Sequence, residues 1–466
     1  MANESELNSL REGATIVSPA TPGGEGAVSI VRLSGPKAFS ILSALASRPL
    51  SFFKPRTLTR ADMRDEHGNL LDAAMAVCFP GPHSFTGEDM AELHLHGSPA
   101  VVEAVIQAAC LSGATPAAPG EFSRRAFQNG KMDLTQAEGL ADLIAARTQA
   151  AASSALRQMR GAISGEISPI RESLVELLLT LETAIDFADE DGVPQADPQQ
   201  ICEKVKEISD KLELVLRSYE KGRIYRDGAI VAITGVTNVG KSLLLNRLAG
   251  EERAIVDDAP GTTRDFLQAE VAMGGVRVLL VDTAGLRDSE DPVEQKGIER
   301  SREIIARADL VLFVMDGGRE VEEKDRLAFE AVRERPHLVV VNKLDLPAKT
   351  AGEEFSGASC GKGVLRVSAK TGEGIDGLVE AIAREFSAGE GAVLAQGPLT
   401  RERHRRAVEK ALEALARASE SAAAGMSPEF AAADVREASR ALAELVGEIA
   451  PEEILNEVFS RFCIGK

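Results

Sequence analysis

The sequence contains few of the aromatic residues on which nucleic-acid bases stack, with no Trp and only two Tyr among 466 residues. Its net charge is −19, whereas proteins that grip nucleic acid with their own surface are usually basic. Composition therefore argues against a broad nucleic-acid-binding surface. A nucleic-acid substrate would need a local basic patch or a partner that supplies one.

Cysteines and long apolar runs are also scarce. The five cysteines, at positions 78, 110, 202, 360 and 463, form no CxxC pair, which argues against a disulfide framework or a zinc site. The first eleven residues lack the apolar core of a signal peptide. No apolar run reaches the roughly 18 residues that a membrane span needs. A cytoplasmic protein without a membrane anchor is the simplest expectation, and the length predicts about three domains.

The most informative stretch is Gly235-Val236-Thr237-Asn238-Val239-Gly240-Lys241-Ser242, which fits the phosphate-binding pattern Gly-x4-Gly-Lys-Ser. It follows an apolar run typical of a buried strand, residues 229–233, and precedes residues 243–248, which indicate a helix. In that context the backbone N–H groups of the loop surround phosphate oxygens. Lys241 would reach the β- and γ-phosphates, and the Ser242 hydroxyl would hold Mg²⁺.

Three further motifs follow in the order that a GTPase requires, each at the end of a predicted strand. Asp282-Thr283-Ala284-Gly285 would contact Mg²⁺ and the γ-phosphate. Asn342-Lys343-Leu344-Asp345 indicates guanine, because the Asp345 carboxylate can accept from the N1–H and the exocyclic amine, a donor pair that adenine lacks. Ser368-Ala369-Lys370 would support the guanine O6. Together they predict a Ras-like α/β domain whose second strand, about 267–273, is antiparallel.

The second switch departs from Ras, where the residue after the DxxG motif is a Gln that orients the attacking water. Here that residue is Leu286, which cannot position water. Either hydrolysis is assisted from outside, or another group takes the role. The nearby polar candidates are Arg287, Asp288, Glu290 and Glu294. The first switch should contain the stretch 261–265, whose threonines are candidate Mg²⁺ ligands.

The rest of the chain predicts an α+β domain and a helical domain. Strands near 15–17, 26–33, 73–79 and 90–95 and a helix over 99–111 indicate the α+β domain. His94 and His96 share one strand face, but no third metal ligand is evident. Helical segments flank the nucleotide domain, and the first should run as one long helix from Asp133 or Thr135 through Leu156. One helical domain with the nucleotide domain inserted is expected, and two separate helical domains are the alternative.

With the stretches PGEFSRRAF (119–127) and FPGPHSFTGED (79–89) and the tail Cys463-Ile464-Gly465-Lys466, the chain closely resembles the MnmE (TrmE) family of tRNA uridine-modification GTPases along nearly its whole length. The resemblance implies a tetrahydrofolate-binding-like domain at 1–130 that mediates homodimerisation. It implies a helical domain in two parts, 131–222 and 387–466, and an inserted Ras-like G domain at 223–386. It also implies a heterotetramer or larger complex with the FAD-dependent partner MnmG (GidA), acting on tRNA.

The resemblance assigns roles to individual residues. The GTPase would be activated by K⁺-dependent dimerisation of G domains, and an aminomethyl or carboxymethylaminomethyl group would be placed on C5 of the wobble uridine. The carbon would come from 5,10-methylene- or 5-formyl-tetrahydrofolate, contacted by Arg32, Glu92, Lys131 and Lys466. Cys463 would act in the modification, and Glu294 would orient water. The Mg²⁺ ligands would be Ser242 and Thr263, and the K⁺ ligands Asn238, Asp257, Ala259 and Thr262.

The complete set of expected GTP-binding residues is Asn238, Val239, Gly240, Lys241, Ser242, Leu243, Asp257, Asp258, Ala259, Pro260, Gly261, Thr262, Thr263, Asp282, Thr283, Ala284, Gly285, Asn342, Lys343, Asp345, Ser368, Ala369 and Lys370. One departure is visible, because the family usually has Pro where this loop has Thr237. A different class of function stays open, namely a regulatory GTPase whose helical domain docks a ribosome or assembly partner without folate chemistry. Glu92, Lys131 and Cys463 distinguish the two functions, because only the tRNA-modification function gives them roles in folate binding or in the modification.

Overall fold

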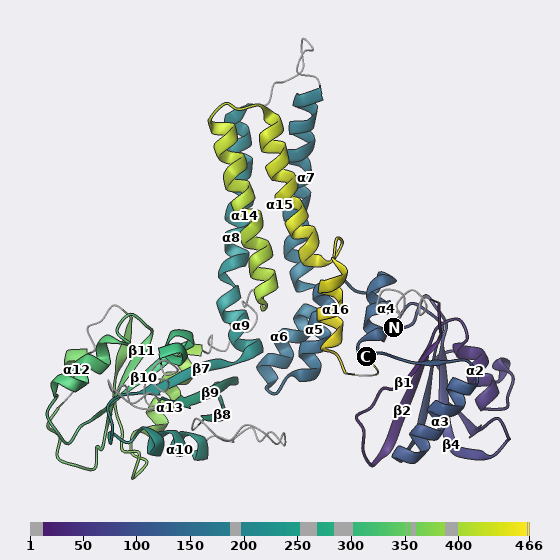
Figure 1. Ribbon diagram of the computed structural model, residues 1–466, viewed down its shortest axis with the longest axis horizontal. Helices are drawn as coiled ribbons and strands as arrows, with labels where there is room; N and C mark the ends of the chain where they lie inside the picture. The colour runs from purple at the N-terminus through teal and green to yellow at the C-terminus, as the bar shows by residue number, and fades with distance from the viewer. Residues whose placement is uncertain are drawn as a thin grey trace, which may run out of the picture. The chain divides into compact units, whose positions relative to one another are not determined.

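The structure is a computed structural model that describes residues 13–186, 197–251, 268–283, 302–350, 352–355, 360–386, 399–463 and 465. The chain divides into two units, of which the first contains residues 1–141 and 442–466 and the second residues 142–441 (Figure 1). Each unit is described by itself below. The finer division into four segments stays a prediction.

A six-stranded sheet forms the centre of the first unit, in the order β3-β4-β5-β2-β1-β6. Its strands are β1 (Ile16–Pro19), β2 (Gly26–Ser34), β3 (Thr59–Arg64), β4 (Leu70–Phe79), β5 (Met90–Gly97) and β6 (Thr115–Pro116). Two helices, α2 (Ala38–Leu45) and α3 (Pro99–Leu111), share one apolar core with the sheet. Because side chains alternate along a strand, Val31 and Leu33 of β2 enter this core and Arg32 faces the other side.

The C-terminal segment belongs to the first unit. Helix α16 (Glu452–Ser460) packs on α4 (Glu121–Gln128) and α5 (Leu134–Ala145). The buried residues of this cluster are Leu134, Ala137, Leu455, Val458, Phe459 and Phe462. Gly120 has φ 68°, and a Cβ there would lie 2.3 Å from the Phe459 carbonyl oxygen. Only glycine therefore lets the chain before α4 approach α16 this closely.

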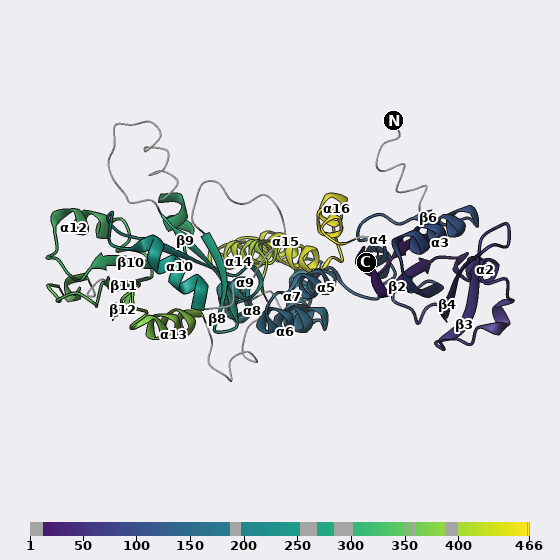
Figure 2. The same cartoon turned by 90° about the horizontal axis from the view of Figure 1, so that it is seen from below.

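Long helices that precede and follow the G domain in the sequence pack together in the second unit. They are α7 (Ala162–Asp186), α8 (Pro198–Arg217), α14 (Glu402–Ala423) and α15 (Pro428–Val446), which Figure 2 views nearly end-on. Helix α8 packs along α14, burying residues at the predicted helical spacing from Ile201 to Val215. The predicted insertion of the G domain into one helical domain is confirmed. None of the helices described is long and apolar enough to cross a membrane.

The single long helix expected from residue 133 to beyond Leu156 is wrong. Helix α5 ends at Ala145 and α6 (Gln149–Met159) begins separately, capped by Thr148, whose Oγ1 accepts from Ala151 N at 3.1 Å. The capping hydroxyl satisfies an N–H that a new helix start leaves without a partner. Asp133 caps α5, since its Oδ1 accepts from Gln136 N at 2.9 Å.

The G domain has a second six-stranded sheet, in the order β12-β11-β10-β7-β9-β8. Its strands are β7 (Ala229–Thr234), β8 (Gln268–Met273), β9 (Val276–Asp282), β10 (Leu310–Asp316), β11 (His337–Asn342) and β12 (Gly361–Arg366). Its helices include α10 (Lys241–Glu251), α12 (Glu323–Glu330) and α13 (Ile375–Phe386). Among the strands that the structure describes in this sheet, only β8 pairs antiparallel, as predicted, so the carboxyl ends of the other strands meet at one edge. The Ras-like fold is confirmed.

Helix α9 (Tyr219–Asp227) leads directly into β7 and is anchored at two points. Arg223 pairs with Asp309, which precedes β10, and the second oxygen of Asp309 accepts from Ile230 N at 2.8 Å. Arg226 pairs with Asp142 at 3.2 Å. These contacts fix the start of the strand that carries the phosphate-binding loop.

Candidate functional site

The loop between β7 and α10 has a backbone that only a few residue types can adopt. Gly235 has φ 143°, and a Cβ there would lie 2.1 Å from the Val314 carbonyl oxygen. Gly240 has φ 96°, and a Cβ there would lie 2.4 Å from Asn342 Nδ2. Asn238 has φ 67°, a conformation that Asn tolerates better than most residues. Both glycines are needed for the loop to lie against β10 and β11.

Lys241 begins α10 with its side chain buried against this loop. Its Nζ donates to the carbonyl oxygens of Gly235 and Val236, both at 3.0 Å. Burial lowers the pKa of Lys241, and the attraction of Asp282 opposes that shift. A buried ammonium beside the first N–H groups of a helix creates a positive site that suits phosphate oxygens.

Ser242 and Asp282 form the acidic side of the same site. The Ser242 Oγ donates to Asp282 Oδ2 at 2.6 Å. Burial raises the pKa of Asp282, while the Ser242 hydrogen bond and Lys241 act in the opposite direction. Within the described residues, Asp282 Oδ1 is buried and has no hydrogen-bond partner. Such an oxygen beside a hydroxyl fits a hard cation such as Mg²⁺, so Ser242 and Asp282 are the described residues that could hold it.

Asn342 connects the phosphate-binding loop to the loop after β12. Its Nδ2 donates to the Val239 carbonyl oxygen at 2.7 Å, and its Oδ1 accepts from Ala369 N at 2.9 Å. The next residue, Lys343, has φ 69° and pairs through Nζ with Asp316 Oδ2 at 2.6 Å. The Asn-Lys-x-Asp motif therefore joins the loops on both sides of the site.

Asp345 lies next to the Ser-Ala-Lys loop, as the sequence predicts. The Ser368 Oγ donates to Asp345 Oδ1 at 2.6 Å, and this hydrogen bond lowers the pKa of Asp345. Asp345 is therefore a charged acceptor at neutral pH, which suits the two N–H donors of guanine. Arg247 of α10 donates to the Lys370 carbonyl oxygen at 2.8 Å and to that of Ala369 at 3.3 Å. Sequence reasoning missed Arg247, because no motif marks it.

The described residues of the four motifs meet at one edge of the G-domain sheet. Thr283 also lies there, donating through both N and Oγ1 to the Ile233 carbonyl oxygen at 3.0 Å, whereas Leu243 is exposed on α10. The remaining predicted site residues lie outside the described residues, and their roles stay predictions. They are Asp257, Asp258, Ala259, Pro260, Gly261, Thr262, Thr263, Ala284, Gly285, Glu294 and Lys466.

A second cluster of predicted site residues lies in the first unit. Arg32 and Glu92 are cross-strand neighbours on β2 and β5, and Arg32 Nε and Nη2 each lie 2.9 Å from Glu92 Oε1. The Arg32 guanidinium also lies over the rings of Phe85, at 5.5 Å, and Phe122, at 5.7 Å. The cation is therefore held on three sides by a carboxylate and two aromatic faces.

The C-terminal tail reaches the same cluster. The Gly465 carbonyl oxygen accepts from Arg32 Nη1 at 3.5 Å, joining residues 433 positions apart. Gly465 has φ 95°, and a Cβ there would lie 1.9 Å from the Pro19 carbonyl oxygen. Cys463 is exposed. Lys131 donates through Nζ to the Pro82 carbonyl oxygen at 3.0 Å, so it contacts the loop that carries Phe85.

The two histidines of β5 pair with carboxylates. His94 Nε2 lies 3.7 Å from Glu92 Oε2, and His96 Nδ1 lies 2.7 Å from Asp72 Oδ1. No group of three potential metal ligands occurs among the residues that the structure describes. His94 shares its strand face with Glu92 and thus adjoins the Arg32 cluster.

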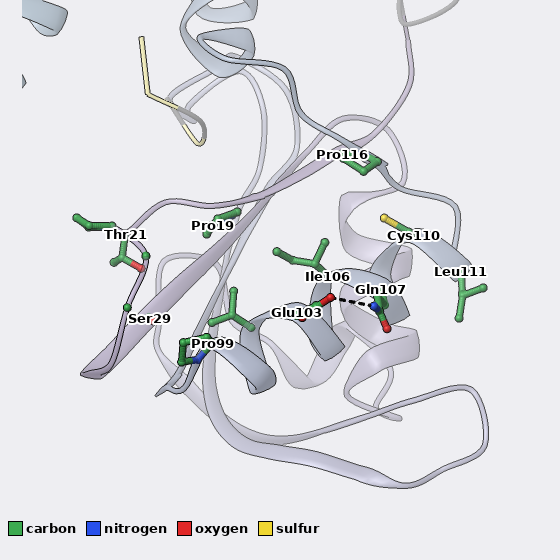
Figure 3. A pocket seen from close by; sticks show the side chains of 14 residues that line it. Pro19, Thr21, Ser29, Pro99, Glu103, Ile106, Gln107, Cys110, Leu111 and Pro116 are labelled. Carbon is green, nitrogen blue, oxygen red and sulfur yellow. Dashed lines mark hydrogen bonds between the residues drawn. The ribbon is translucent and has the colours of Figure 1, made fainter. Parts of the chain in front are cut away.

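A cavity of about 730 Å³ lies beside α3, lined mainly by apolar side chains (Figure 3). Pro19, Ile106 and Pro116 border it, and a 3.4 Å hydrogen bond joins Gln107 to Glu103 at its edge. Its lining includes Ser29, which lies on the opposite side of β2 from Arg32. The cavity is therefore separate from the Arg32–Glu92 cluster.

Sequence comparisons match both units. The model of the MnmE helical domain matches residues 134–463, and that of the GTP-binding protein TrmE N-terminus matches residues 15–131. The tRNA modification GTPase MnmE of Aquifex aeolicus (strain VF5) is 42% identical over 453 residues, covering 97% of this chain and 99% of that protein. The protein of the same name from Paramagnetospirillum magneticum (strain ATCC 700264 / AMB-1) is 44% identical over 456 residues, with the same coverage.

Solved structures match a smaller part of the chain. A point variant of Aquifex aeolicus Era bound to GDP.AlF4- is 28% identical, with a TM-score of 0.30, and the match covers 34% of this chain and 57% of that one. The G domain of T. maritima FeoB is 27% identical, with a TM-score of 0.28, and the match covers 34% of this chain and 99% of that one. The family assignment comes from the sequence matches, which span nearly the whole length. The chain belongs to the MnmE family of tRNA modification GTPases.

Proposed function

We propose that this protein is a K⁺-activated GTPase that modifies C5 of the wobble uridine of certain tRNAs together with an FAD-dependent partner of the MnmG (GidA) family. The product carries an aminomethyl or carboxymethylaminomethyl group whose one-carbon unit comes from a tetrahydrofolate. One observation carries the proposal: four guanine-nucleotide motifs occur in order in a chain that aligns with tRNA modification GTPases over 97% of its length. The compartment expected for this activity is the cytoplasm.

The G domain binds and hydrolyses GTP in this proposal. Lys241 contacts the β- and γ-phosphates, and Asp345 accepts from the guanine N1–H and amine. Ser242 and Asp282, with Thr263, would hold Mg²⁺, which would offset negative charge on the phosphate oxygens. Glu294 orients the attacking water through a second water and so takes the role of the missing Gln. Support comes from the Ser242–Asp282 hydrogen bond at 2.6 Å and the buried Oδ1 of Asp282.

Asn238, with Asp257, Ala259 and Thr262, would hold K⁺ when two G domains of a homodimer face each other. The ion would supply positive charge that offsets charge developing on the phosphates in the transition state. Asn238 is exposed on the phosphate-binding loop, which suits a residue that completes its site at a dimer contact. Hydrolysis in KCl should exceed hydrolysis in NaCl at equal ionic strength. Equal rates in the two salts would remove Asn238 and K⁺ from the mechanism.

The first unit binds the folate. Glu92 suits the N–H donors of the pterin ring, and Arg32, Lys131 and Lys466 suit the carboxylates of the folate's glutamate part. Cys463, three residues from the chain end, acts in the modification step. The contact between Arg32 and the Gly465 carbonyl oxygen supports a site that needs both the N-terminal strands and the tail.

Equilibrium dialysis of 5-formyl-tetrahydrofolate against the full chain tests this part of the proposal. Arg32→Ala should abolish binding, because it removes the cation that contacts both Glu92 and the tail. The matched control is Arg64→Ala, which removes a half-buried arginine from the edge strand β3. If the unsubstituted chain binds no folate, the folate chemistry is wrong and a regulatory GTPase becomes the better account.

A further inference from the structure

One stretch of the first unit has a charge opposite to that of the whole chain. From Gly26 to Ala61 there are six Lys and Arg residues and no Asp or Glu, in a chain of net charge −19. Four of these cations fall within residues 47–60, here named the basic strip. Every residue of the basic strip is exposed except Phe53, which is buried, and Thr59, which is half-buried. The four cations are Arg48, Lys54, Arg56 and Arg60.

The cations of the basic strip are not neutralised by the protein. Within the described part of the chain, none of the four forms an ion pair with a carboxylate, and the next acidic residue, Asp62, pairs with Arg64 at 3.7 Å. Arg56 Nη2 donates to the His83 carbonyl oxygen at 2.6 Å. By contrast, the exposed cations Lys211 and Arg217 on α8 pair with glutamates one turn away, at 2.8 and 3.3 Å. The basic strip therefore presents its charge to an external anion.

The basic strip also exposes an aromatic ring. Phe52 is 41% exposed, and only Phe430 among the other described Phe and Tyr side chains is comparably exposed, at 53%. The Arg48 guanidinium lies over the Phe52 ring, 5.2 Å from its centroid. Aromatic rings and arginine planes are the groups on which unpaired bases stack in RNA-binding proteins.

The basic strip is held in place before any partner arrives. Its 3₁₀ turn η1 (Leu50–Phe52) follows Pro49, and the adjacent Phe53 is buried in the core of the first unit. Arg56 N donates to the Cys78 carbonyl oxygen at 2.9 Å. A surface fixed in this way loses little conformational entropy when it binds.

We propose that the basic strip is an RNA-binding surface, whose four cations contact the phosphate backbone of tRNA and whose Phe52 stacks on an unpaired base. This inference rests on the proposed function, since it assigns the surface through which that function holds its RNA. An anionic membrane is the less suitable partner, because η1 is only three residues long and provides no amphipathic helix. The acidic remainder of the chain repels RNA elsewhere and so confines binding to the basic strip.

The salt dependence of tRNA binding tests the cations. The probe is a transcribed tRNA with uridine at the wobble position, titrated with the full chain in 50–200 mM KCl. The test variant carries Arg48→Gln, Lys54→Gln, Arg56→Gln and Arg60→Gln. The matched control removes the same charge from α8 with Lys204→Gln, Lys206→Gln, Lys211→Gln and Arg217→Gln.

A plot of log affinity against log salt has a negative slope, whose magnitude should decrease by about three in the test variant. Each phosphate that the protein no longer neutralises accounts for about 0.7–0.9 of this decrease. The slope of the control should not change. The GTPase rate should be unchanged in both, which shows that the G domain is folded in each variant. Equal slopes in the test and control variants would overturn the proposal, as would undetectable binding by the unsubstituted chain at 50 mM KCl. Binding of anionic phosphatidylglycerol vesicles that falls in the test variant, with an unchanged tRNA slope, would mark a membrane surface instead.

The aromatic contact has its own test. Phe52→Ala should weaken tRNA binding roughly 5- to 150-fold with an unchanged salt slope, because stacking is independent of charge. Phe430→Ala, on α15, should bind as the unsubstituted chain does. Equal affinities of the two variants would overturn the stacking contact.

A deletion strain distinguishes failure of the proposed function from failure of this inference. If the strain keeps its wobble modification, the proposed function fails. If the modification is lost but the salt dependence of tRNA binding is the same in the test variant and the unsubstituted chain, this inference alone is refuted.

Discussion

Replacing Asn342 with Ala is expected to separate the two loops that are predicted to flank the nucleotide. The Asn342 side chain donates to the Val239 carbonyl oxygen at 2.7 Å and accepts from Ala369 N at 2.9 Å. Asn342, Val239 and Ala369 are all no more than 2% exposed, so water cannot replace the missing partner. Each buried group left without a hydrogen bond costs about 1–3 kcal/mol, and the two together cost about 2–6 kcal/mol.

Thermal unfolding of the full chain measures this loss. In a domain of this size each kcal/mol shifts Tm by about 2–4 °C, so the G-domain transition should fall by roughly 4–24 °C. Asn246→Ala, which replaces an exposed asparagine on α10, should leave it unchanged. Affinity for a fluorescent GDP should fall in Asn342→Ala only, because both loops are predicted to contact the nucleotide. If the two variants unfold and bind alike, the bridge contributes nothing and the reasoning is refuted.

Three further predictions concern other parts of the two sites. Burial raises the pKa of Asp282 above the ordinary 3.8, so the folded, nucleotide-free protein favours the protonated carboxyl. The stability that this carboxyl contributes is therefore present below the ordinary pKa of 3.8 and is lost as pH rises through the pKa in the folded protein. Asp282→Asn should therefore flatten the decline of Tm above about pH 4 and abolish Mg²⁺-dependent hydrolysis, and an unchanged slope would contradict this. Gly465→Ala should displace the tail, because its Cβ would lie 1.9 Å from the Pro19 carbonyl oxygen. Folate binding should then fall with GTPase activity intact, whereas Gly425→Ala, which also has a positive φ but open space around its Cβ, should leave folate binding unchanged. Glu294→Ala should stop hydrolysis while GTP still binds, and unchanged turnover would exclude Glu294.

The G domain could be predicted almost entirely from the sequence. Parallel strands covered on both faces are continuous apolar runs, and β7, β10 and β11 fit that pattern. The glycines, lysine and serine of the phosphate-binding loop also have a spacing that few other structures require. By contrast, the bridge made by Asn342 could not be predicted, because it depends on how two loops distant in sequence approach each other.

The first unit and the helices were harder to predict. Sequence reasoning missed α2 and β3, and it missed α16, a nine-residue helix that docks where Gly120 leaves room. The break at Thr148 interrupts an alanine-rich segment of high helix propensity, so tertiary packing and one capping hydroxyl outweigh local preference. The contact of Arg32 with Gly465 crosses almost the whole chain. Only the resemblance to a known family suggested that these two regions meet.

The most direct test of the central claim is the modification state of tRNA wobble uridines in a strain from which this protein has been deleted. Mass spectrometry of purified tRNA should show wobble uridines without the aminomethyl or carboxymethylaminomethyl group at C5, and re-expression of the full chain should restore it. Wobble uridines modified to the same extent in the deletion strain and its parent would contradict the account.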